Sequence, residues 1–193
     1  MTPPLDIGII DTMIGFPARN MRKQYAFITK QTHDRESKED FEFPVEYMFK
    51  DVPDKRLDKD ADPQDVTLRE MDLWGVEKGV IGVNGDIGER AVRDHPDRFL
   101  PQLSVDPNDG MDALRKIDKY ADEFDLRSVG AFPAGLLPQA PLNDKMFYPI
   151  YMKCIERDIV FCSTAGVPGP RLRYAPQDVA LIDEVCWFFP ELK

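Results

Sequence analysis

The chain has 193 residues, of which 42% are hydrophobic and 31% are charged, as expected for one folded globular domain with its own core. Its net charge of −10 argues against a nucleic-acid-binding or anionic-membrane-binding surface, because such surfaces are basic. The sequence shows neither a run of about 18 apolar residues nor a secretory signal. We therefore expect a cytoplasmic protein without nucleic-acid or membrane partners.

The chain begins with an apolar run at residues 7–10, which predicts a first β-strand that ends at Asp11. Residues 16–62 follow as a long irregular stretch that mixes aromatic and charged side chains. A stretch of this length inside a compact domain indicates an insertion with small elements of its own. Within it, residues 22–30 predict one or two turns of helix.

Regular alternation of helices and strands begins at residue 63. Pro63 opens a predicted helix that has Val66, Met71 and Leu73 on its inner side, and Gly75 ends it. Further helices are predicted over 89–94, 109–124, 147–156 and 176–189, and strands over 76–83, 99–105, 126–132 and 159–162. This alternation predicts an α/β fold with parallel strands joined by right-handed crossovers.

The number of strand–helix units, about five, bounds the architecture. A closed (β/α)₈ barrel needs about 250 residues, so if the fold is TIM-barrel-like, the domain over residues 1–193 is incomplete. A complete, doubly wound open sheet fits the length equally well. An incomplete barrel leaves two unpaired sheet edges, and we therefore expect the chain to form homo-oligomers.

The three cysteines, Cys154, Cys162 and Cys186, are odd in number and lie in apolar contexts. We interpret them as buried free thiols in a reducing compartment. The two histidines, His33 and His95, lie away from the predicted strand ends, and we assign them surface or capping roles.

Several segments together resemble the amidohydrolase-2 family, which is related to aminocarboxymuconate semialdehyde decarboxylase. They are Ile10-Asp11-Thr12, the segment from Met71 to Val80, His95-Pro96-Asp97-Arg98-Phe99, Val105-Asp106-Pro107, Pro149-Ile150-Tyr151 and Phe189-Pro190-Glu191-Leu192-Lys193. The resemblance implies a barrel that is a hydrolase or a non-oxidative decarboxylase, with zinc as its usual metal.

The resemblance does not extend to the residues that hold this metal. The family carries two histidines after the first strand, where this chain has Met13 and Gly15, and one after the fifth strand, where it has Ser163 or Thr164. Asp11 alone remains from the set. We therefore predict no metal site and no bound cofactor, although zinc is expected for the family.

The ends of the predicted strands supply the candidate functional residues, because barrel chemistry lies at the carboxyl ends of strands. Asp11 and Asp106 are candidates for acid–base catalysis, although Asp106 also suits a helix cap. The candidates for substrate binding are Asn84, Ser163, Thr164, Arg171 and Arg173. The two arginines suit a carboxylate, and alternatively they pair with the insertion or offset the acidic surface.

These observations leave two functional hypotheses. The first is a hydrolase or non-oxidative decarboxylase that acts on a small-molecule substrate carrying a carboxylic acid, without the usual zinc site. The second is a non-catalytic barrel that serves as a binding or assembly module. The sequence does not decide whether the protein is an enzyme.

Overall fold

The structure of the chain is a computed structural model that describes residues 7–17, 26–35, 38 and 61–193. Most of the predicted insertion over 16–62 lies outside the described residues, so its boundaries remain a prediction. The described part of the helix predicted over 22–30 is the single turn α2, Ala26–Thr29.

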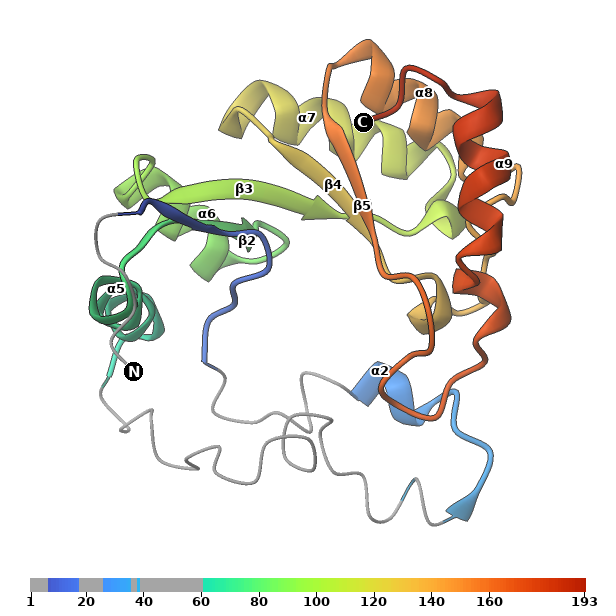
Figure 1. Cartoon of the computed structure of the whole chain (residues 1–193), viewed down its shortest axis with the longest axis horizontal. Coiled ribbons are helices and arrows are strands. Elements are labelled where there is room, and N and C mark those ends of the chain that lie inside the picture. Colours follow the sequence, from blue (N-terminus) through green and yellow to red (C-terminus); the bar gives the residue numbers. More distant parts are fainter. Residues whose placement is uncertain (1–6, 18–25, 36–37, 39–60) are drawn as a thin grey trace.

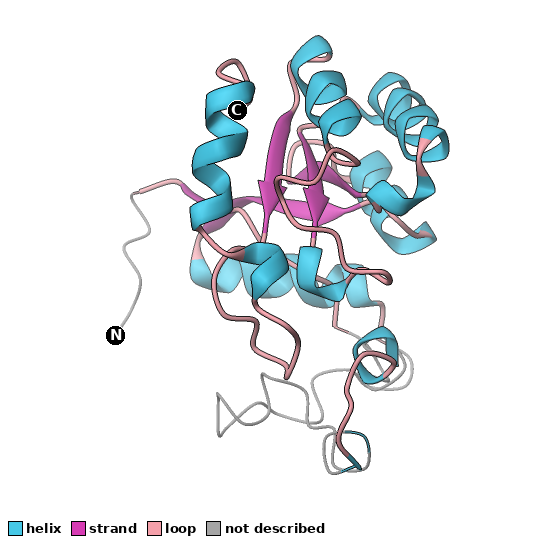
Figure 2. Ribbon diagram, turned by 90° about the vertical axis from the view of Figure 1, so that its right-hand side faces the viewer, coloured by secondary structure: helices cyan, strands magenta, loops and turns pink. Residues whose placement is uncertain are grey.

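Five parallel strands form one sheet in the order β1-β2-β3-β4-β5 and curve into a half-barrel (Figure 1). The parallel strands confirm the prediction from the alternation of elements, and the half-barrel confirms the incomplete TIM-barrel-like domain over the open sheet. The strands are β1 Ile9–Asp11, β2 Val76–Gly82, β3 Phe99–Ser104, β4 Ser128–Ala131 and β5 Val160–Ser163. All five begin and end within two residues of the predicted limits. Because they are parallel, their carboxyl ends and the following loops lie at one edge of the sheet (Figure 2).

Helices follow the strands and pack on the outer face of the sheet (Figures 1 and 2). They are α5 Pro63–Trp74, α6 Asp86–Asp94, α7 Met111–Phe124, α8 Tyr148–Glu156 and α9 Ala180–Phe188, with 3₁₀ turns η1 Pro107–Asp109, η2 Pro133–Gly135 and η3 Ala175–Gln177. Among the described residues, none of the helices has the length and apolar character needed to cross a membrane.

Helix α5 shows how the local sequence fixes an element. Asp62 caps its start by accepting a hydrogen bond from the Gln64 N–H at 2.9 Å, and Gly75 ends it with a left-handed φ of 68°. Met71 is buried as predicted, but the prediction for Leu73 was wrong, because its side chain is 62% exposed. Residues two positions apart in a helix are separated by about 200° around its axis, so Leu73 lies opposite Met71.

Helix α9 begins four residues later than predicted. The segment 176–179 turns through η3 first, and the Asp178 carboxylate accepts a hydrogen bond from the Ala180 N–H at 3.0 Å where the helix starts. The side chain of Gln177 is buried in this turn. The pattern predicted one continuous helix, whereas the chain forms a 3₁₀ turn around the buried Gln177 before the helix starts.

The two faces of the sheet differ in burial. In β3, Phe99 and Leu103 are buried against the helices, whereas Gln102 is half-buried and Ser104 exposed on the inner face. This alternation follows from the two-residue repeat of a strand. The main core therefore lies outside the sheet, and the inner, concave face is open to ligands.

The cysteines confirm one expectation and correct another. All three are free thiols, but only Cys154 is buried; Cys162 is half-buried and Cys186 is exposed. Cys154 lies on the inner side of α8 against the core, whereas Cys186 lies on the outer side of α9. Both cysteines have apolar neighbours in the sequence, so the sequence context did not show that Cys186 lies on the exposed side of α9.

The open edge of β5 is partly covered, because the Phe161 N–H donates a hydrogen bond to the carbonyl of Lys193 at 2.8 Å. This hydrogen bond lies within one chain and does not test association between copies. Homo-oligomer formation therefore remains a prediction.

Candidate functional site

A cavity of about 610 Å³ lies on the inner face of the half-barrel at the carboxyl ends of β3, β4 and β5. Strand positions and the loops after the strands build it together. Its lining consists of Thr12, Met13, Phe27, Gln102, Ser104, Val105, Gly130, Ala131, Phe132, Gly135, Leu136, Cys162, Ser163 and Thr164. Among these described residues none carries a charged side chain, so the cavity suits an apolar or aromatic group with few polar contacts.

One wall of the cavity comes from the segment around α2. The ring of Phe27 meets the ring of Phe132 edge-on, with 6.4 Å between centroids. Gln31 donates from Nε2 to the carbonyl of Gly135 at 2.7 Å, which fixes the same segment to the loop after β4. In Figure 1, α2 accordingly lies beside the loops at the carboxyl ends of the strands.

The buried side chain of Gln177 holds together the loops that follow β4 and β5 beside the cavity. Its Nε2 donates to the carbonyl of Gly166 at 2.8 Å, and its Oε1 accepts from the Ala134 N–H at 3.3 Å and from Thr164 Oγ1 at 3.2 Å. This one carboxamide thus joins the loops after β4 and β5. The sequence analysis missed Gln177, and nothing in its local pattern distinguishes it from an exposed glutamine of a helix start.

The two candidate catalytic carboxylates lie beside the cavity but not in its lining. Asp11 Oδ1 accepts a hydrogen bond from the Met13 N–H at 2.9 Å and shapes the turn after β1. Asp106 Oδ1 accepts from the Asn108 N–H at 2.9 Å and caps η1. Asp106 therefore has the capping function that its position suggested, and a catalytic role for either residue remains a prediction.

The uncharged candidates for substrate binding are partly engaged within the protein. Asn84 exchanges two hydrogen bonds with the backbone of Ser104. Ser163 and Thr164 do line the cavity, and their hydroxyls contact the Thr164 carbonyl at 3.0 Å and the Gln177 side chain, respectively. The structure thus brings Ser163 and Thr164 to the cavity and places Asn84 at the neighbouring end of β2.

The two candidate arginines lie in the loop between β5 and η3, and both are exposed. Arg171 pairs with Asp34 at 3.4 Å, so it contacts the insertion, which was the alternative considered for it. Neither arginine lines the cavity. Contact of Arg171 or Arg173 with a substrate remains a prediction.

The residues at the family's metal positions do not fit a zinc site. Met13, Ser163 and Thr164 line the cavity, and none of them carries a carboxylate, imidazole or thiolate. The ring of His95 packs against Phe99 at the other end of β3. Within the described residues, no group of three or more His, Cys, Asp or Glu side chains is arranged so that it could hold a metal ion. The absence of a metal site remains a prediction.

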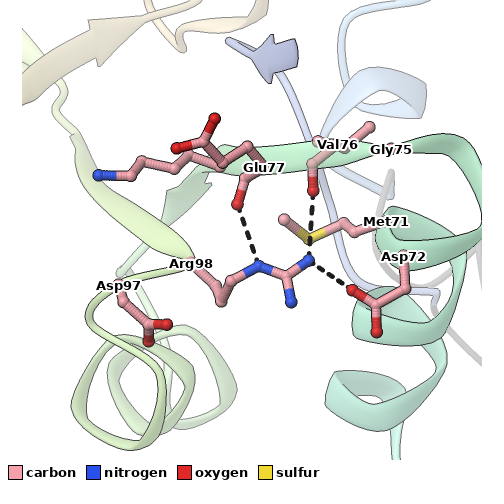
Figure 3. A pocket seen from close by; sticks show the side chains of 8 residues that line it. Met71, Asp72, Gly75, Val76, Glu77, Asp97 and Arg98 are labelled. Carbon is pink, nitrogen blue, oxygen red and sulfur yellow. Dashed lines mark hydrogen bonds and ion pairs between the residues drawn. The ribbon is translucent and has the colours of Figure 1, made fainter. Parts of the chain in front are cut away.

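A second cavity, of about 550 Å³, lies at the opposite edge of the sheet, where β2 and β3 begin (Figure 3). Arg98 lies across it and donates to the Asp72 carboxylate at 2.8 Å, to the Glu77 carbonyl at 3.0 Å and to the Val76 carbonyl at 3.2 Å. Its guanidinium thus joins α5, β2 and the start of β3. Because this is the amino end of the strands, we interpret the cavity as part of the structural framework.

Comparisons with solved structures follow this geometry. An uncharacterised TIM-barrel protein of Bordetella bronchiseptica superposes with a TM-score of 0.62 at 20% identity, over 97% of this chain and 65% of its own. The 5-carboxyvanillate decarboxylase of Sphingomonas paucimobilis gives 0.63 at 15%, over 96% and 66%. A second such decarboxylase, of Novosphingobium aromaticivorans, gives 0.54 at 20%, over 81% and 50%.

The chain has the fold of part of a TIM barrel. It spans about two thirds or less of the length of these three solved structures. A scan against protein-family models finds no match, and neither does a search of curated proteins. The likeness therefore establishes the architecture that the sequence predicted, and activity has to be argued from the site.

Proposed function

We propose that this chain forms part of an amidohydrolase-type enzyme, a hydrolase or non-oxidative decarboxylase, which acts on a small aromatic compound that carries a carboxylate. The observation that carries the proposal is the cavity at the carboxyl ends of β3, β4 and β5, on a sheet of this architecture. Its walls of Phe27, Phe132 and Leu136 suit a planar apolar ring.

The ligand bound to one of the structural neighbours supports the same substrate class. One of the decarboxylases is complexed with manganese and 4-hydroxy-3-methoxy-5-nitrobenzoic acid, which has the shape and charge of such a compound. In this chain the uncharged lining suits the ring of the substrate better than its carboxylate, because a carboxylate buried without a partner loses its hydration. We place the carboxylate at the mouth, on the side of Arg171 and Arg173.

Proton transfer in this proposal falls to Asp11 or Asp106. Each uses Oδ1 to hold a backbone turn, which leaves Oδ2 for contact with a substrate or water. Loss of carbon dioxide from an aromatic acid requires a proton to be delivered to the ring carbon, and a carboxylic acid beside the cavity is a suitable donor.

Turnover of a panel of carboxylated aromatic compounds tests the proposal. The full chain is incubated with 5-carboxyvanillate, dihydroxybenzoates and their methyl esters, with and without added manganese or zinc, and products are separated by chromatography. We expect carbon dioxide release or ester hydrolysis that falls at least tenfold in Phe132→Ala. Turnover that Phe132→Ala leaves unchanged would contradict the assignment to this cavity.

One observation favours a second candidate function, a non-catalytic binding module. The described lining of the cavity holds no histidine or carboxylate that could transfer a proton inside it. The same panel distinguishes the two: binding of the aromatic acids without any product, at every metal condition, would favour the binding module over the enzyme.

A further inference from the structure

The inner face of the sheet carries a row of small side chains at the floor of the cavity. Ser104 of β3 lies opposite Gly130 of β4, and Gly130 lies opposite Cys162 of β5. Neighbouring strands are about 4.8 Å apart, so a hydroxyl and a thiol flank the position at which Gly130 lacks a side chain. All three residues line the cavity.

The carboxamide of Gln102 fills the space above this glycine. Gln102 lies opposite Ser128, one inward position nearer the amino ends of the strands, yet a Cβ on residue 130 would overlap the Nε2 atom of Gln102. The side chain must therefore run toward the carboxyl ends and across β4. Glycine at 130 is what allows the carboxamide to reach the cavity.

The carboxamide has unused hydrogen-bonding capacity. Gln102 is half-buried, and within the described residues its side chain makes no hydrogen bond. The neighbouring Ser128 hydroxyl is buried and also lacks a partner there. A half-buried carboxamide that offers both a donor and an acceptor to an otherwise uncharged cavity is suited to one polar, uncharged group of a ligand.

We propose that Gln102 is a specificity-determining residue that hydrogen-bonds an uncharged polar substituent on an aromatic ring held in this cavity. The inference rests on the proposed function, since it takes the cavity as the substrate site. The ring enters with its neutral polar group toward Gln102 and Gly130, and a carboxylate on the same ring faces the mouth. The residue thereby selects both the substituent and the orientation of the ring.

Three uncharged aromatic probes test this role with the full chain. Benzamide can donate and accept hydrogen bonds, acetophenone can only accept, and toluene can do neither. Dissociation constants are measured by NMR titration for the wild type and for Gln102→Leu and Gln102→Glu, with folding checked by circular dichroism. Gln139→Leu is the matched control, because Gln139 binds the Ala134 carbonyl outside the lining.

We expect Gln102→Leu to raise the dissociation constants of benzamide and acetophenone by roughly threefold to tenfold, which is the effect of one hydrogen bond. The dissociation constant of toluene should change by less than about twofold. Gln102→Glu keeps the size of the side chain but removes its hydrogen-bond donor, so it should weaken the binding of acetophenone in the same way. Gly130→Ala keeps Gln102 and displaces its carboxamide, with the same expected loss. Gln139→Leu leaves all three constants unchanged.

Two outcomes would overturn the inference alone: equal weakening of all three probes, which would mark Gln102 as a shape-determining residue, or constants for benzamide and acetophenone that no substitution at 102 or 130 changes. Absence of binding by every probe to the wild type would instead overturn the proposed function together with the inference. If Gln102→Leu fails to fold, the loss of acetophenone binding in Gln102→Glu decides.

Discussion

The carboxamide of Asn84 pairs with both backbone polar groups of Ser104. Its Nδ2 donates to the Ser104 carbonyl at 2.7 Å, and its Oδ1 accepts from the Ser104 N–H at 2.7 Å. A side chain that follows β2 thus extends the hydrogen-bond ladder to the end of β3. The finding gives Asn84 a structural function beside the cavity in addition to the substrate contact proposed for it.

Replacement of Asn84 by alanine removes both hydrogen bonds. We expect the free energy of unfolding to fall by about 1–2 kcal/mol, because the site is exposed and water replaces part of the lost interaction. Asn84→Asp retains the acceptor and loses the donor. Its free energy of unfolding should therefore lie between those of Asn84→Ala and the wild type, or below both. Urea unfolding measures these differences. A variant Asn84→Ala with wild-type stability would leave only the substrate contact as the reason for this residue.

The buried carboxamide of Gln177 should contribute more to the free energy of unfolding than the side chain of Asn84. Gln177→Leu leaves the Gly166 carbonyl, the Ala134 N–H and the Thr164 hydroxyl without a partner, and we expect a loss of about 2–4 kcal/mol. Gln139→Leu removes one half-buried bond and should cost about 1 kcal/mol. Equal losses in the two variants, measured by thermal unfolding, would show that the loops after β4 and β5 do not depend on Gln177.

The sequence predicted the sheet well for a physical reason. Each strand and helix carries its own repeat of apolar residues, and Gly75 or Pro63 marks a boundary through backbone geometry alone. The five strands and their parallel direction therefore follow from local signals, whereas their order in the sheet does not. The error at Leu73 has the same origin. An apolar side chain on the exposed side of a helix cannot be distinguished from a buried one by its residue type alone.

The site was less predictable because its contacts join residues that are distant in sequence. Ser163 and Thr164 were selected because the carboxyl end of a strand is a known position in a barrel, and both line the cavity. Gln102 and Gln177 were not, because their roles depend on a glycine of the next strand and on two separate loops. Only the folded arrangement shows that Gly130 makes room for a carboxamide.

Arg98 should be more important for stability than an exposed arginine. Its side chain is 24% exposed and satisfies two backbone carbonyls and Asp72 (Figure 3). We expect Arg98→Ala to lower the free energy of unfolding by about 2–3 kcal/mol, and Arg98→Lys to recover little, because an ammonium cannot reach all three acceptors. Arg115→Ala, at an ion pair exposed on both sides, should cost less than about 0.5 kcal/mol by the same urea titration.

The cysteines should react with a thiol reagent in a fixed order. Burial raises the pKa of the Cys154 thiol to about 12, so almost no thiolate forms at pH 8. Cys186 is exposed on α9 and should react first, whereas Cys154 should react only when the protein unfolds. Labelling followed by mass spectrometry checks the order, with Cys186→Ser losing the fast phase. Rapid labelling of Cys154 in the folded state would contradict the packing of α8.

The pairing of α7 with α8 should make stability depend on pH in the acid range. Hydrogen bonds from the Arg157 guanidinium, and further ones from Lys153, outweigh desolvation and hold the pKa of Asp118 below its usual value. A carboxyl with a lowered folded-state pKa stabilises the protein above its unfolded pKa of about 4, and this contribution is lost as the pH falls through the folded value.

Asp118→Asn should therefore be less stable than wild type at pH 7, and the difference should shrink as the pH falls below about 4. The Asp118 side chain is 36% exposed, so solvent screening keeps the effect small. Arg157→Gln removes the main cause of the shift and should flatten the same part of the profile. Urea unfolding at several pH values between about 2.5 and 7 measures both. Parallel profiles for wild type and Asp118→Asn would show that the pair does not couple to folding.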